Sequence, residues 1–540
     1  MTAGGGGGEP GARYDAVVIG AGFSGMYMLH RLRGLGMSAR VYEAGDGVGG
    51  TWYWNRYPGA RCDVESVQYS YSFDEDLEQE WEWSERYPSQ PEILRYAEHV
   101  ADRFDLRRDI RFGTRVTRAA YDGSTRRWRV ETDRGDRVEC GFLIAAVGCL
   151  SAARVPGFPG ADSFRGASYH TGRWPHEGVD LTGRRVAVIG TGSSGIQAIP
   201  VIAGQAAHVT VFQRTPNFSL PAWNRPLDPE EARWVKANYA ALRQDMRTSP
   251  VGLLVAFNDR SVLEAGEEER AREFEARWAE GGFAFLGAYG DMSIDPEANE
   301  VAAEFVRGKI REIVRDPEVA ERLSPRDHPI GSKRICVDTG YYSTYNRPNV
   351  TLVDVRRDPI KEITPTGVRT AGGHHSVDVI VYATGYDAMT GPLLAVDITG
   401  EGGRSLRDKW RAGPRAYLGL MTAGFPNLFT ITGPGSPSVL SNMLVSIEQH
   451  VDWIADCLAR LRAGGIATID ADPAAEDAWV AHVNEVASYT LYPRADSWYM
   501  GANIPGKPRV FMPYAGGVGA YRQKCDQVAA DGYEGFVLSA

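Results

Sequence analysis

The sequence of 540 residues contains few cysteines, no excess of positive charge and no long apolar segment. Its six cysteines are scattered and form no Cys-x-x-Cys pair, so neither a zinc site nor a redox-active dithiol is predicted. Reduced thiols in a cytoplasm are the simplest interpretation, because disulfides are rare there. The net charge of −10 disfavours broad binding to nucleic acid or to anionic membranes, since both need basic patches.

No apolar run approaches the roughly 20 residues that a membrane-spanning helix needs. Residues 1–12 lack the apolar stretch of a secretory signal, and we expect a flexible tail there. What the chain does contain is 43% apolar and 24% charged residues, which is the composition of a globular protein. A chain of 540 residues is too long for one hydrophobic core, so several domains are expected, and a monomer is the default oligomeric state.

A strand over Tyr14–Ile19 is predicted to enter the glycine turn Gly20-x-Gly22-x-x-Gly25. A helix from Phe23 and a second strand, ending at Glu43, complete a βαβ unit. The glycines allow a tight turn and close approach to a pyrophosphate, which the helix N-terminus favours. Glu43 stands 23 residues after Gly20, where an acid accepts hydrogen bonds from a ribose diol. We call the domain built on this turn the first module.

A second turn, Gly190-x-Gly192-x-x-Gly195, follows a strand over Arg185–Ile189 and defines the second module. The position 23 residues after Gly190 is Gln213, followed by Arg214 and Thr215. An acid there would repel a ribose 2′-phosphate, whereas an arginine pairs with it. The two modules are therefore predicted to hold different nucleotides, FAD in the first and NADPH in the second. The alternative is that Arg214 is only a solvated surface charge.

The rest of the chain is arranged around these two units. The segment 49–73 is dense in aromatic residues, which form either a packed core or a wall for a flat ring cofactor. Apolar strands over Phe142–Val147 and Asp378–Ala383 both end in Ala-x-Gly, as in a weak repeat. We expect an α/β fold with residues 13–150 and 386–540 in the FAD-binding domain, 151–225 and 331–385 in the NADP-binding domain, and a helical insert over 226–330.

NADPH beside FAD implies hydride transfer to the flavin. A disulfide reductase would need a cysteine pair, and none exists. Reduced flavin can instead react with dioxygen, and a protein that exploits this needs a positive group in a dry cavity. Lys333-Arg334 lies between the helical insert and a module strand, where a loop can reach the region between domains. A Lys-Arg pair is, however, more often solvated surface than catalytic.

The pattern Phe164-x-Gly166-x-x-x-His170-x-x-x-Trp174-Pro175 resembles the fingerprint of the type I Baeyer–Villiger monooxygenases. Related flavin-containing and N-hydroxylating monooxygenases carry a similar pattern without the Trp-Pro ending. The segment GGTWYWNRYPGARCD between the two turns, and Asp378-x-Ile380 followed by Ala-Thr-Gly, match two further family motifs. The likeness runs over nearly the whole chain, from about residue 14 to residue 537, and is strongest to the phenylacetone-oxidising branch of that family.

The resemblance implies roles for individual residues. Arg334 matches the arginine that stabilises the flavin peroxide and its adduct with the ketone, and Asp63 matches the carboxylate that holds this arginine. Lys333, Arg214 and Thr215 match contacts to the 2′-phosphate. Ser441, Asn442 and Met443 match a substrate-pocket loop of the longer type. The predicted cofactor-binding residues are Gly20, Gly22, Phe23, Ser24, Gly25, Glu43, Thr51, Trp52, Asp63, Tyr69, Thr191, Gly192, Ser193, Ser194, Gly195, Gln197, Arg214, Thr215, Lys333, Arg334, Met443 and Trp498.

By this resemblance the chain is expected to insert one oxygen atom from dioxygen beside a ketone carbonyl, through NADPH-reduced FAD and a C4a-peroxyflavin, with sulfoxidation as a side activity. Val439 and Cys336 depart from the family pattern, which leaves the preferred ketone open. The alternatives are a heteroatom monooxygenase and a flavin reductase without oxygen insertion. Within the fingerprint, His170 and Trp174 are expected to brace the hinge between modules rather than to take part in the chemistry.

Overall fold

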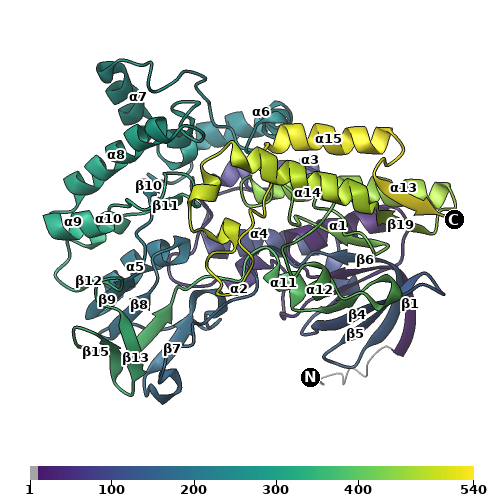
Figure 1. The fold of residues 1–540 in the computed structure, drawn as a ribbon, viewed down its shortest axis with the longest axis horizontal. Helices are drawn as coiled ribbons and strands as arrows, with labels where there is room; N and C mark the ends of the chain where they lie inside the picture. The colour runs from purple at the N-terminus through teal and green to yellow at the C-terminus, as the bar shows by residue number, and fades with distance from the viewer. Residues whose placement is uncertain (1–9) are drawn as a thin grey trace.

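The computed structural model describes residues 10–540 and confirms the α/β fold with two modules (Figure 1). Residues 1–9 of the predicted tail lie outside the described residues, and residues 10–12 already belong to the first strand. The first module is an eight-stranded sheet in the order β17 (Asp397–Thr399), β4 (Val116–Asp122), β5 (Arg127–Thr132), β6 (Arg137–Ala145), β1 (Pro10–Ile19), β2 (Ala39–Tyr42) and β3 (Ile110–Arg111), with β18 (Leu428–Thr430) also paired to β6. Parallel pairing joins β3, β2, β1 and β6, and β6, β5 and β4 form an antiparallel meander.

The second module is a five-stranded, wholly parallel sheet. Its order is β12 (Val350–Asp354), β9 (His208–Gln213), β8 (Arg185–Ile189), β16 (Val379–Tyr382) and β7 (Ala167–His170). Strands β1 and β8 are both central, and their apolar side chains over 16–19 and 186–189 are at most 7% exposed. Continuous apolar runs of this kind are expected where both faces of a parallel sheet are covered.

Three smaller sheets complete the strands. They are the antiparallel β13 (Ile360–Thr364), β14 (Gly367–Thr370) and β15 (His374–Ser376), the parallel pair β10 (Ser219–Pro221) and β11 (Cys336–Asp338), and the antiparallel pair β19 (Thr468–Ala471) and β20 (Phe536–Ser539). Strand β11 begins two residues after Arg334, so it fixes the segment that carries the predicted catalytic arginine.

Helices cover the sheets in three groups. Those of the first module are α1 (Phe23–Gly34), α2 (Thr51–Trp54), α3 (Glu75–Glu80), α4 (Gln90–Arg103), α11 (Gly391–Leu394), α12 (Leu406–Lys409), α13 (Met443–Ala463), α14 (Pro473–Ser488) and α15 (Val518–Ala530). The second module has α5 (Ser193–Gln205) and α10 (Tyr341–Thr344), and the insert has α6 (Pro229–Thr248), α7 (Glu267–Glu280), α8 (Pro296–Ile313) and α9 (Pro317–Leu323). Helix α1 packs against α13, so the C-terminal part of the chain contacts the first module.

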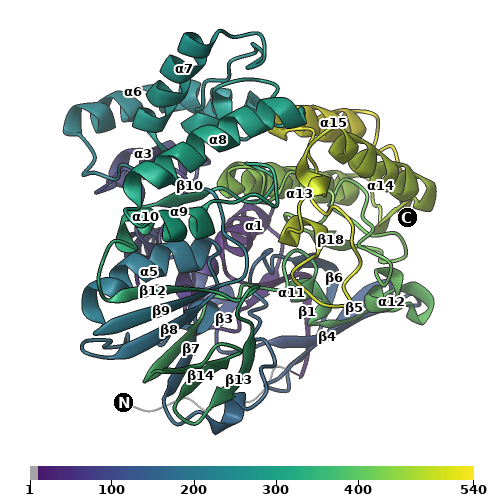
Figure 2. The same ribbon diagram turned by 60° about the vertical axis from the view of Figure 1, so that its left-hand side comes forward.

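The helical insert is divided between the two modules, whereas the sequence places it with the second. Helix α6 contacts α3 and α15 (Figures 1 and 2). Met246 of α6 packs with Val445 and Val518 of the first module. Helices α7, α8 and α9 instead share the core of the second module through residues such as Phe274 and Val306. The insert therefore connects the two halves of the molecule.

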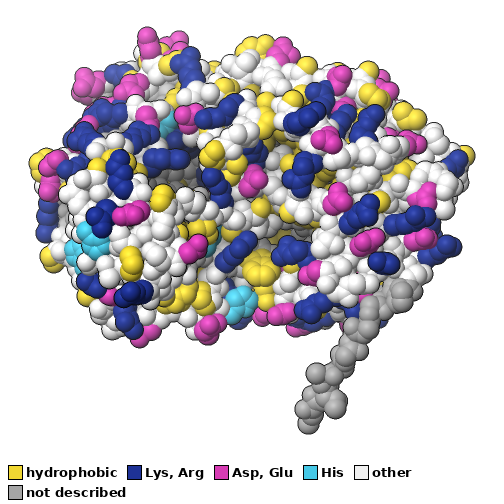
Figure 3. Space-filling view, turned by 60° about the horizontal axis from the view of Figure 1, so that its bottom comes forward, with side chains coloured by type: hydrophobic (Ala, Val, Ile, Leu, Met, Phe, Trp, Pro, Cys, Tyr) yellow, Lys and Arg dark blue, Asp and Glu magenta, His cyan; other side chains and the backbone are white. Residues whose placement is uncertain are grey.

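The surface carries charges of both signs. On the face in Figure 3, lysine and arginine side chains alternate with aspartate and glutamate, and apolar side chains lie between them. Among residues 10–540, no helix is long and apolar enough to cross a membrane.

Candidate functional site

The two glycine turns have the same backbone geometry. Gly20 and Gly190 adopt φ of +104° and +112°, and a Cβ on either would overlap the carbonyl oxygen of Ala146 or Ala383, the first residue after β6 or β16. A Cβ on the third glycine of each turn would overlap the carbonyl of the first. Only glycine fits these positions, because lack of space excludes a side chain at all four, and Gly20 and Gly190 also have a positive φ.

Both turns can accept a pyrophosphate. Helices α1 and α5 begin after Gly22 and Gly192 without a side-chain cap, so the backbone N–H groups of their first turns remain available. A Cβ on Gly192 would meet nothing within 4 Å, which shows open space in front of α5. Neighbouring side chains are already engaged: Ser24 donates to Ala146, and Ser194 bonds Thr171.

Glu43 lies over the first turn. One carboxylate oxygen accepts from Ala21 N–H at 2.8 Å and the other from Gly45 N–H at 2.7 Å. Burial raises the pKa of this carboxyl, while the two backbone hydrogen bonds oppose the rise. The side chain is only 6% exposed, so a ribose bound there would meet a preorganised acceptor.

The equivalent side chain of the second module points elsewhere. Gln213 donates from its amide to the carbonyl of Arg322 at 2.7 Å and is 2% exposed. Thr191 of the second turn donates to the Thr215 carbonyl at 3.0 Å, which fixes the end of β9 against the turn. Arg214 is exposed and has no ion-pair partner within 4 Å among the described residues. No acid faces the second turn from this position.

Three cations gather beside Thr215. Burial lowers the pKa of Lys333, and the nearby Arg214 and Arg356 lower it further, whereas Asp327 opposes them. Arg356 donates to the Thr215 hydroxyl at 3.0 Å and pairs with Asp327. Arg356 was not predicted, yet it follows β12, the strand beside β9, and parallel neighbours end at the same sheet edge. Its position just after β12 is the sequence signal from which Arg356 could have been predicted.

Asp63 and Arg334 meet directly, although 271 residues separate them. Arg334 donates from Nε to one carboxylate oxygen at 2.9 Å and from Nη2 to the other at 2.8 Å. Both side chains are partly buried, with 22% of Arg334 and 23% of Asp63 exposed. This bidentate pair joins the segment after α2 to the segment before β11, and therefore links the two halves.

The surroundings of Arg334 fix its orientation further. Nη1 donates to the Val439 carbonyl at 2.8 Å, and the guanidinium lies over the Phe283 ring at 5.0 Å. Burial would lower the pKa of Arg334, but the Asp63 carboxylate outweighs it and raises that pKa above its usual value. Arg334 is therefore a permanent cation. Neither the Val439 carbonyl nor Phe283 was predicted, because backbone groups and loop aromatics leave no pattern in a sequence.

The predicted flavin contacts form an aromatic wall next to α1. Trp52 donates from its indole to the Tyr69 hydroxyl at 3.1 Å, and the Tyr69 ring meets Phe23 edge to face at 6.1 Å. All three side chains are less than 9% exposed. Thr51, the first residue of α2, is exposed, so it lies at the rim of this wall.

The predicted pocket loop is mostly engaged in local structure. Asn442 is fully buried, caps α13 through Leu444 N–H at 3.1 Å and donates to the Gln68 carbonyl at 2.7 Å. Ser441 is 4% exposed and bonds Ser446 at 2.7 Å. Met443 is the member of this loop that contacts Val439, the residue whose carbonyl accepts from Arg334. Its sulfur accepts from Val439 N–H at 3.3 Å.

The remaining predicted contacts lie near the boundary of the modules. Gln197 of α5 accepts from the Tyr57 hydroxyl at 2.7 Å and donates to the Arg61 carbonyl at 3.1 Å, both in the first module. Ser193 lies 3.4 Å from the Cys336 sulfur. Trp498 stacks at a tilt on Tyr499, whose ring lies near Arg334.

The fingerprint residues brace the edge of the second sheet. His170 ends β7, accepts from Gly172 N–H at 2.9 Å and bonds the Arg154 carbonyl at 3.1 Å. Trp174 is 3% exposed in the core of the second module. A Cβ on Gly166 would overlap the Asp378 carbonyl and the Phe164 ring, so this position needs glycine. Pro175 follows Trp174 in the turn that closes at Gly178.

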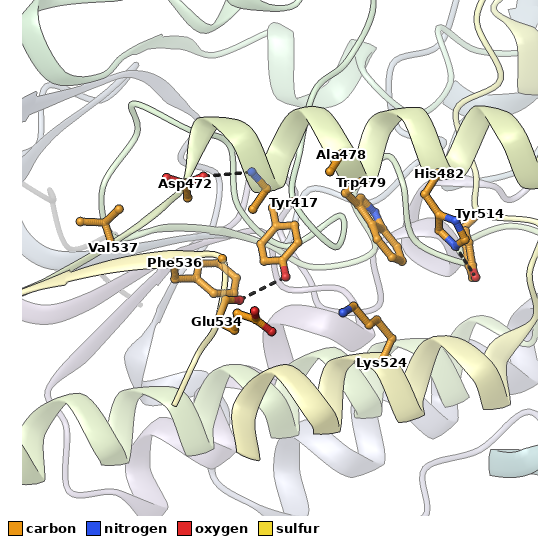
Figure 4. Close-up of a pocket in the computed structure, with 12 residues that line it drawn as sticks. Tyr417, Asp472, Ala478, Trp479, His482, Tyr514, Lys524, Glu534, Phe536 and Val537 are labelled. Atoms are coloured by element: carbon orange, nitrogen blue, oxygen red, sulfur yellow. Dashed lines mark hydrogen bonds between the residues drawn. The ribbon is translucent and has the colours of Figure 1, made fainter. Parts of the chain in front are cut away.

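A separate cavity of about 780 Å³ lies in the first module, between α14, α15 and β20 (Figure 4). Trp479 and His482 project into it from α14, Lys524 from α15, and Phe536 and Val537 from β20. None of the predicted site residues lines this cavity. The predicted site residues therefore lie outside this cavity.

Comparison with known proteins gives a consistent result. Residues 17–240 match the family model described as pyridine nucleotide-disulphide oxidoreductase. The chain is 45% identical to a Baeyer-Villiger monooxygenase of Pseudooceanicola batsensis, over 98% of this chain and 96% of the relative. It is 42% identical to phenazine N-monooxygenase PhzNO1 of Lysobacter antibioticus, over 97% of each chain.

Among solved structures, the chain is similar to an oxidized steroid monooxygenase bound to NADP. The two are 55% identical, with a TM-score of 0.94, over 98% of this chain and 100% of the other. Similarity of this extent covers both modules, the helical insert and the C-terminal helices.

Proposed function

The chain belongs to the FAD- and NADPH-dependent Baeyer–Villiger monooxygenases, and from that premise we propose that Arg334, held by Asp63, is the cation at which it inserts oxygen beside the carbonyl of a ketone. The product is an ester or a lactone. Bound FAD, once reduced by NADPH, supplies the oxygen atom activated from dioxygen. The observation that carries the proposal is the bidentate pair between Asp63 and Arg334.

The pair leaves Arg334 both oriented and able to donate. A guanidinium has five N–H donors, and three are engaged by Asp63 and Val439. The two that remain can stabilise negative charge on the oxygen that attacks the carbonyl carbon. A fixed donor of this type in a partly dry site contributes about 3–4 kcal/mol to lowering a barrier. Asp63 keeps the Arg334 guanidinium in place and reduces the net charge of the site.

The cations beside Thr215 support NADPH over NADH. Lys333, Arg214 and Arg356 together place three positive groups at the end of β9, where a 2′-phosphate would lie. Glu43 in the first module supports an unphosphorylated ribose, which fits FAD. We propose that the enzyme works in the cytoplasm on a small-molecule ketone, where its six free, buried cysteines would persist as thiols.

The proposal is tested with purified holoenzyme, NADPH, ¹⁸O₂ and a panel of aryl, cyclic and steroid-like ketones. We expect an ester or lactone that carries one labelled oxygen. NADPH consumption that yields only hydrogen peroxide with every ketone would contradict oxygen insertion. In parallel reactions with amines and thioethers, labelled N-oxides or sulfoxides, with no ester from any ketone, would favour a heteroatom monooxygenase. The relative from Lysobacter antibioticus is named a phenazine N-monooxygenase.

The role of Arg334 is tested by Arg334→Ala. We expect ester formation to fall by about 100-fold or more, the size seen when an oxyanion donor is removed, while NADPH still reduces the flavin. Arg326→Ala is the matched control, because Arg326 pairs with Glu321 on the surface of the insert. Retained ester formation in Arg334→Ala would remove this residue from its role.

A further inference from the structure

Arg243 fastens the helical insert to the first module. It lies on α6, is 5% exposed and donates from Nε to Glu78 at 2.7 Å. Its other nitrogens donate to the Ser70 hydroxyl at 2.6 Å and to the Gln68 carbonyl at 3.3 Å. The guanidinium also lies over the Tyr239 ring of the same helix, at 4.7 Å. A buried arginine with three polar partners holds those partners in one arrangement.

The segment that Arg243 holds is also tied to the predicted pocket loop. The Gln68 carbonyl accepts from Asn442, which caps α13, and the Gln68 side chain accepts from Leu254 N–H at 2.8 Å. One turn further along α6, Arg247 donates to the Ser72 hydroxyl at 2.9 Å. Hydrogen bonds from α6, from Leu254 in the segment after α6, and from the N-terminal cap of α13 therefore converge on residues 68–72.

Tyr69 lies in the sequence between Gln68 and Ser70, two of the residues that Arg243 contacts. Its hydroxyl accepts from Trp52, and its ring packs against Phe23 at the start of α1. Any shift of Gln68 or Ser70 would move this ring within the wall assigned to the flavin. The same shift would act on Asn442. Three residues before Asn442, the carbonyl of Val439 accepts a hydrogen bond from Arg334.

We propose that Arg243 is a positioning residue: from the insert it sets the place of Tyr69 and of the Val439–Met443 loop, and thereby determines how much of the NADPH consumed ends in oxygenated product. This inference rests on the proposed function. It assigns to α6 a task that its sequence does not suggest, because α6 is otherwise a surface helix with an apolar stripe. The fraction of oxygen that escapes as hydrogen peroxide should depend on this contact, since misplacement of a reacting group by about 1 Å can cost a factor of 100.

The test compares Arg243→Met, Arg243→Lys and the double variant Arg243→Met/Glu78→Gln as FAD-loaded holoenzymes. We measure the ester formed per NADPH, the rate of flavin reduction, the Tm and the hydrogen exchange of residues 66–73. The double variant removes the carboxylate that Arg243→Met would leave buried without its cation. We expect it to recover Tm but to retain an ester yield per NADPH lowered by about tenfold and faster exchange in 66–73. Arg243→Lys, which keeps the charge, should recover part of the yield.

Arg307→Met is the matched control. Arg307 is also a buried arginine of the insert, at 2% exposure, but its partners Glu300, Glu304 and Pro325 belong to the insert and to the segment after α9. It should lower Tm without changing the ester yield per NADPH. If the double variant regains both Tm and yield, or if Arg307→Met lowers the yield equally, Arg243 acts only through folding and the proposal is wrong. If the parent enzyme forms no ester, the exchange in 66–73 still tests the contact itself.

Discussion

The two glycine turns share a backbone geometry and differ in the side chain that follows 23 residues after the first glycine. At both turns the first glycine has a positive φ and lies against the carbonyl of the alanine that follows the return strand, Ala146 in one module and Ala383 in the other. After the second strand, Glu43 bends over its own turn, whereas Gln213 turns away to the carbonyl of Arg322. The glycines therefore predict a dinucleotide site. The residue 23 positions after the first glycine, together with its neighbours, predicts which dinucleotide binds.

The strongest way to break this equivalence is to substitute the third glycine of each turn. A Cβ on Gly25 would overlap the Gly20 carbonyl more severely than a Cβ on Gly195 overlaps that of Gly190. We expect Gly25→Ala to lose about 3 kcal/mol of stability or more and to retain no FAD. Gly195→Ala should keep its flavin and lose NADP⁺ binding. Thermal unfolding, flavin content and NADP⁺ titration measure both, and loss of flavin from Gly195→Ala would refute the separation.

Glu43→Gln tests the ribose acceptor of the first module. It keeps the shape but removes the charge from hydrogen bonds that contribute about 1.5–3 kcal/mol each. We expect the Kd for FAD to rise by about 10- to 100-fold, with the Kd for NADP⁺ unchanged. Calorimetric titration of the apoprotein checks this. Gln213→Asn, at the matching position, is the control and should leave the FAD affinity alone.

The cations of the second module are tested by Arg214→Ala and Arg356→Ala. Both should raise the KM for NADPH and leave the KM for NADH unchanged. For Arg214→Ala we expect a rise of roughly tenfold, equivalent to about 1.4 kcal/mol. Arg356 should have the smaller effect, because its pair with Asp327 already neutralises part of its charge. If a variant raises the KM for NADPH and the KM for NADH equally, the substituted arginine does not bind the 2′-phosphate.

The smallest expected effect is a pH dependence that only the second module shows. The pKa of Lys333 is lowered by burial and by neighbouring cations, so the free protein loses this charge earlier than usual as pH rises. NADP⁺ affinity should therefore decline on the alkaline side, by less than about tenfold, while FAD affinity does not. Lys333→Arg, which stays charged, should flatten the profile. An unchanged profile in that variant would assign the effect to another group.

Much of this molecule could be predicted from its sequence. Each βαβ unit follows from local signals, a strand, three glycines at fixed spacing and a helix, and both were found at their positions. The likeness to a known family suggested that Asp63 and Arg334 interact, and they form an ion pair. The functional roles of these residues remain predictions.

What could not be predicted depends on contacts between distant segments. The apolar stripe of α6 predicts that this face is buried but does not specify against which module. In the structure Met246 packs against Val445 of the first module. The Val439 carbonyl is a backbone group and has no residue type to signal it. Asn442 shows the converse: its place in a pocket motif hides that it is fully buried and caps a helix.

The contact of Gln197 with the first module has a consequence for protein engineering. Its amide is bonded at one end by Tyr57 and at the other by Arg61, and a Cβ on the intervening Gly59 would overlap the Gln197 carbonyl. A chimera that exchanges the NADPH-binding half while keeping the native loop 57–61 would pack this loop against a helix α5 whose side chains do not match it. Successful grafts should carry this loop together with α5, so the natural unit of exchange is larger than the domain and includes a piece of its neighbour.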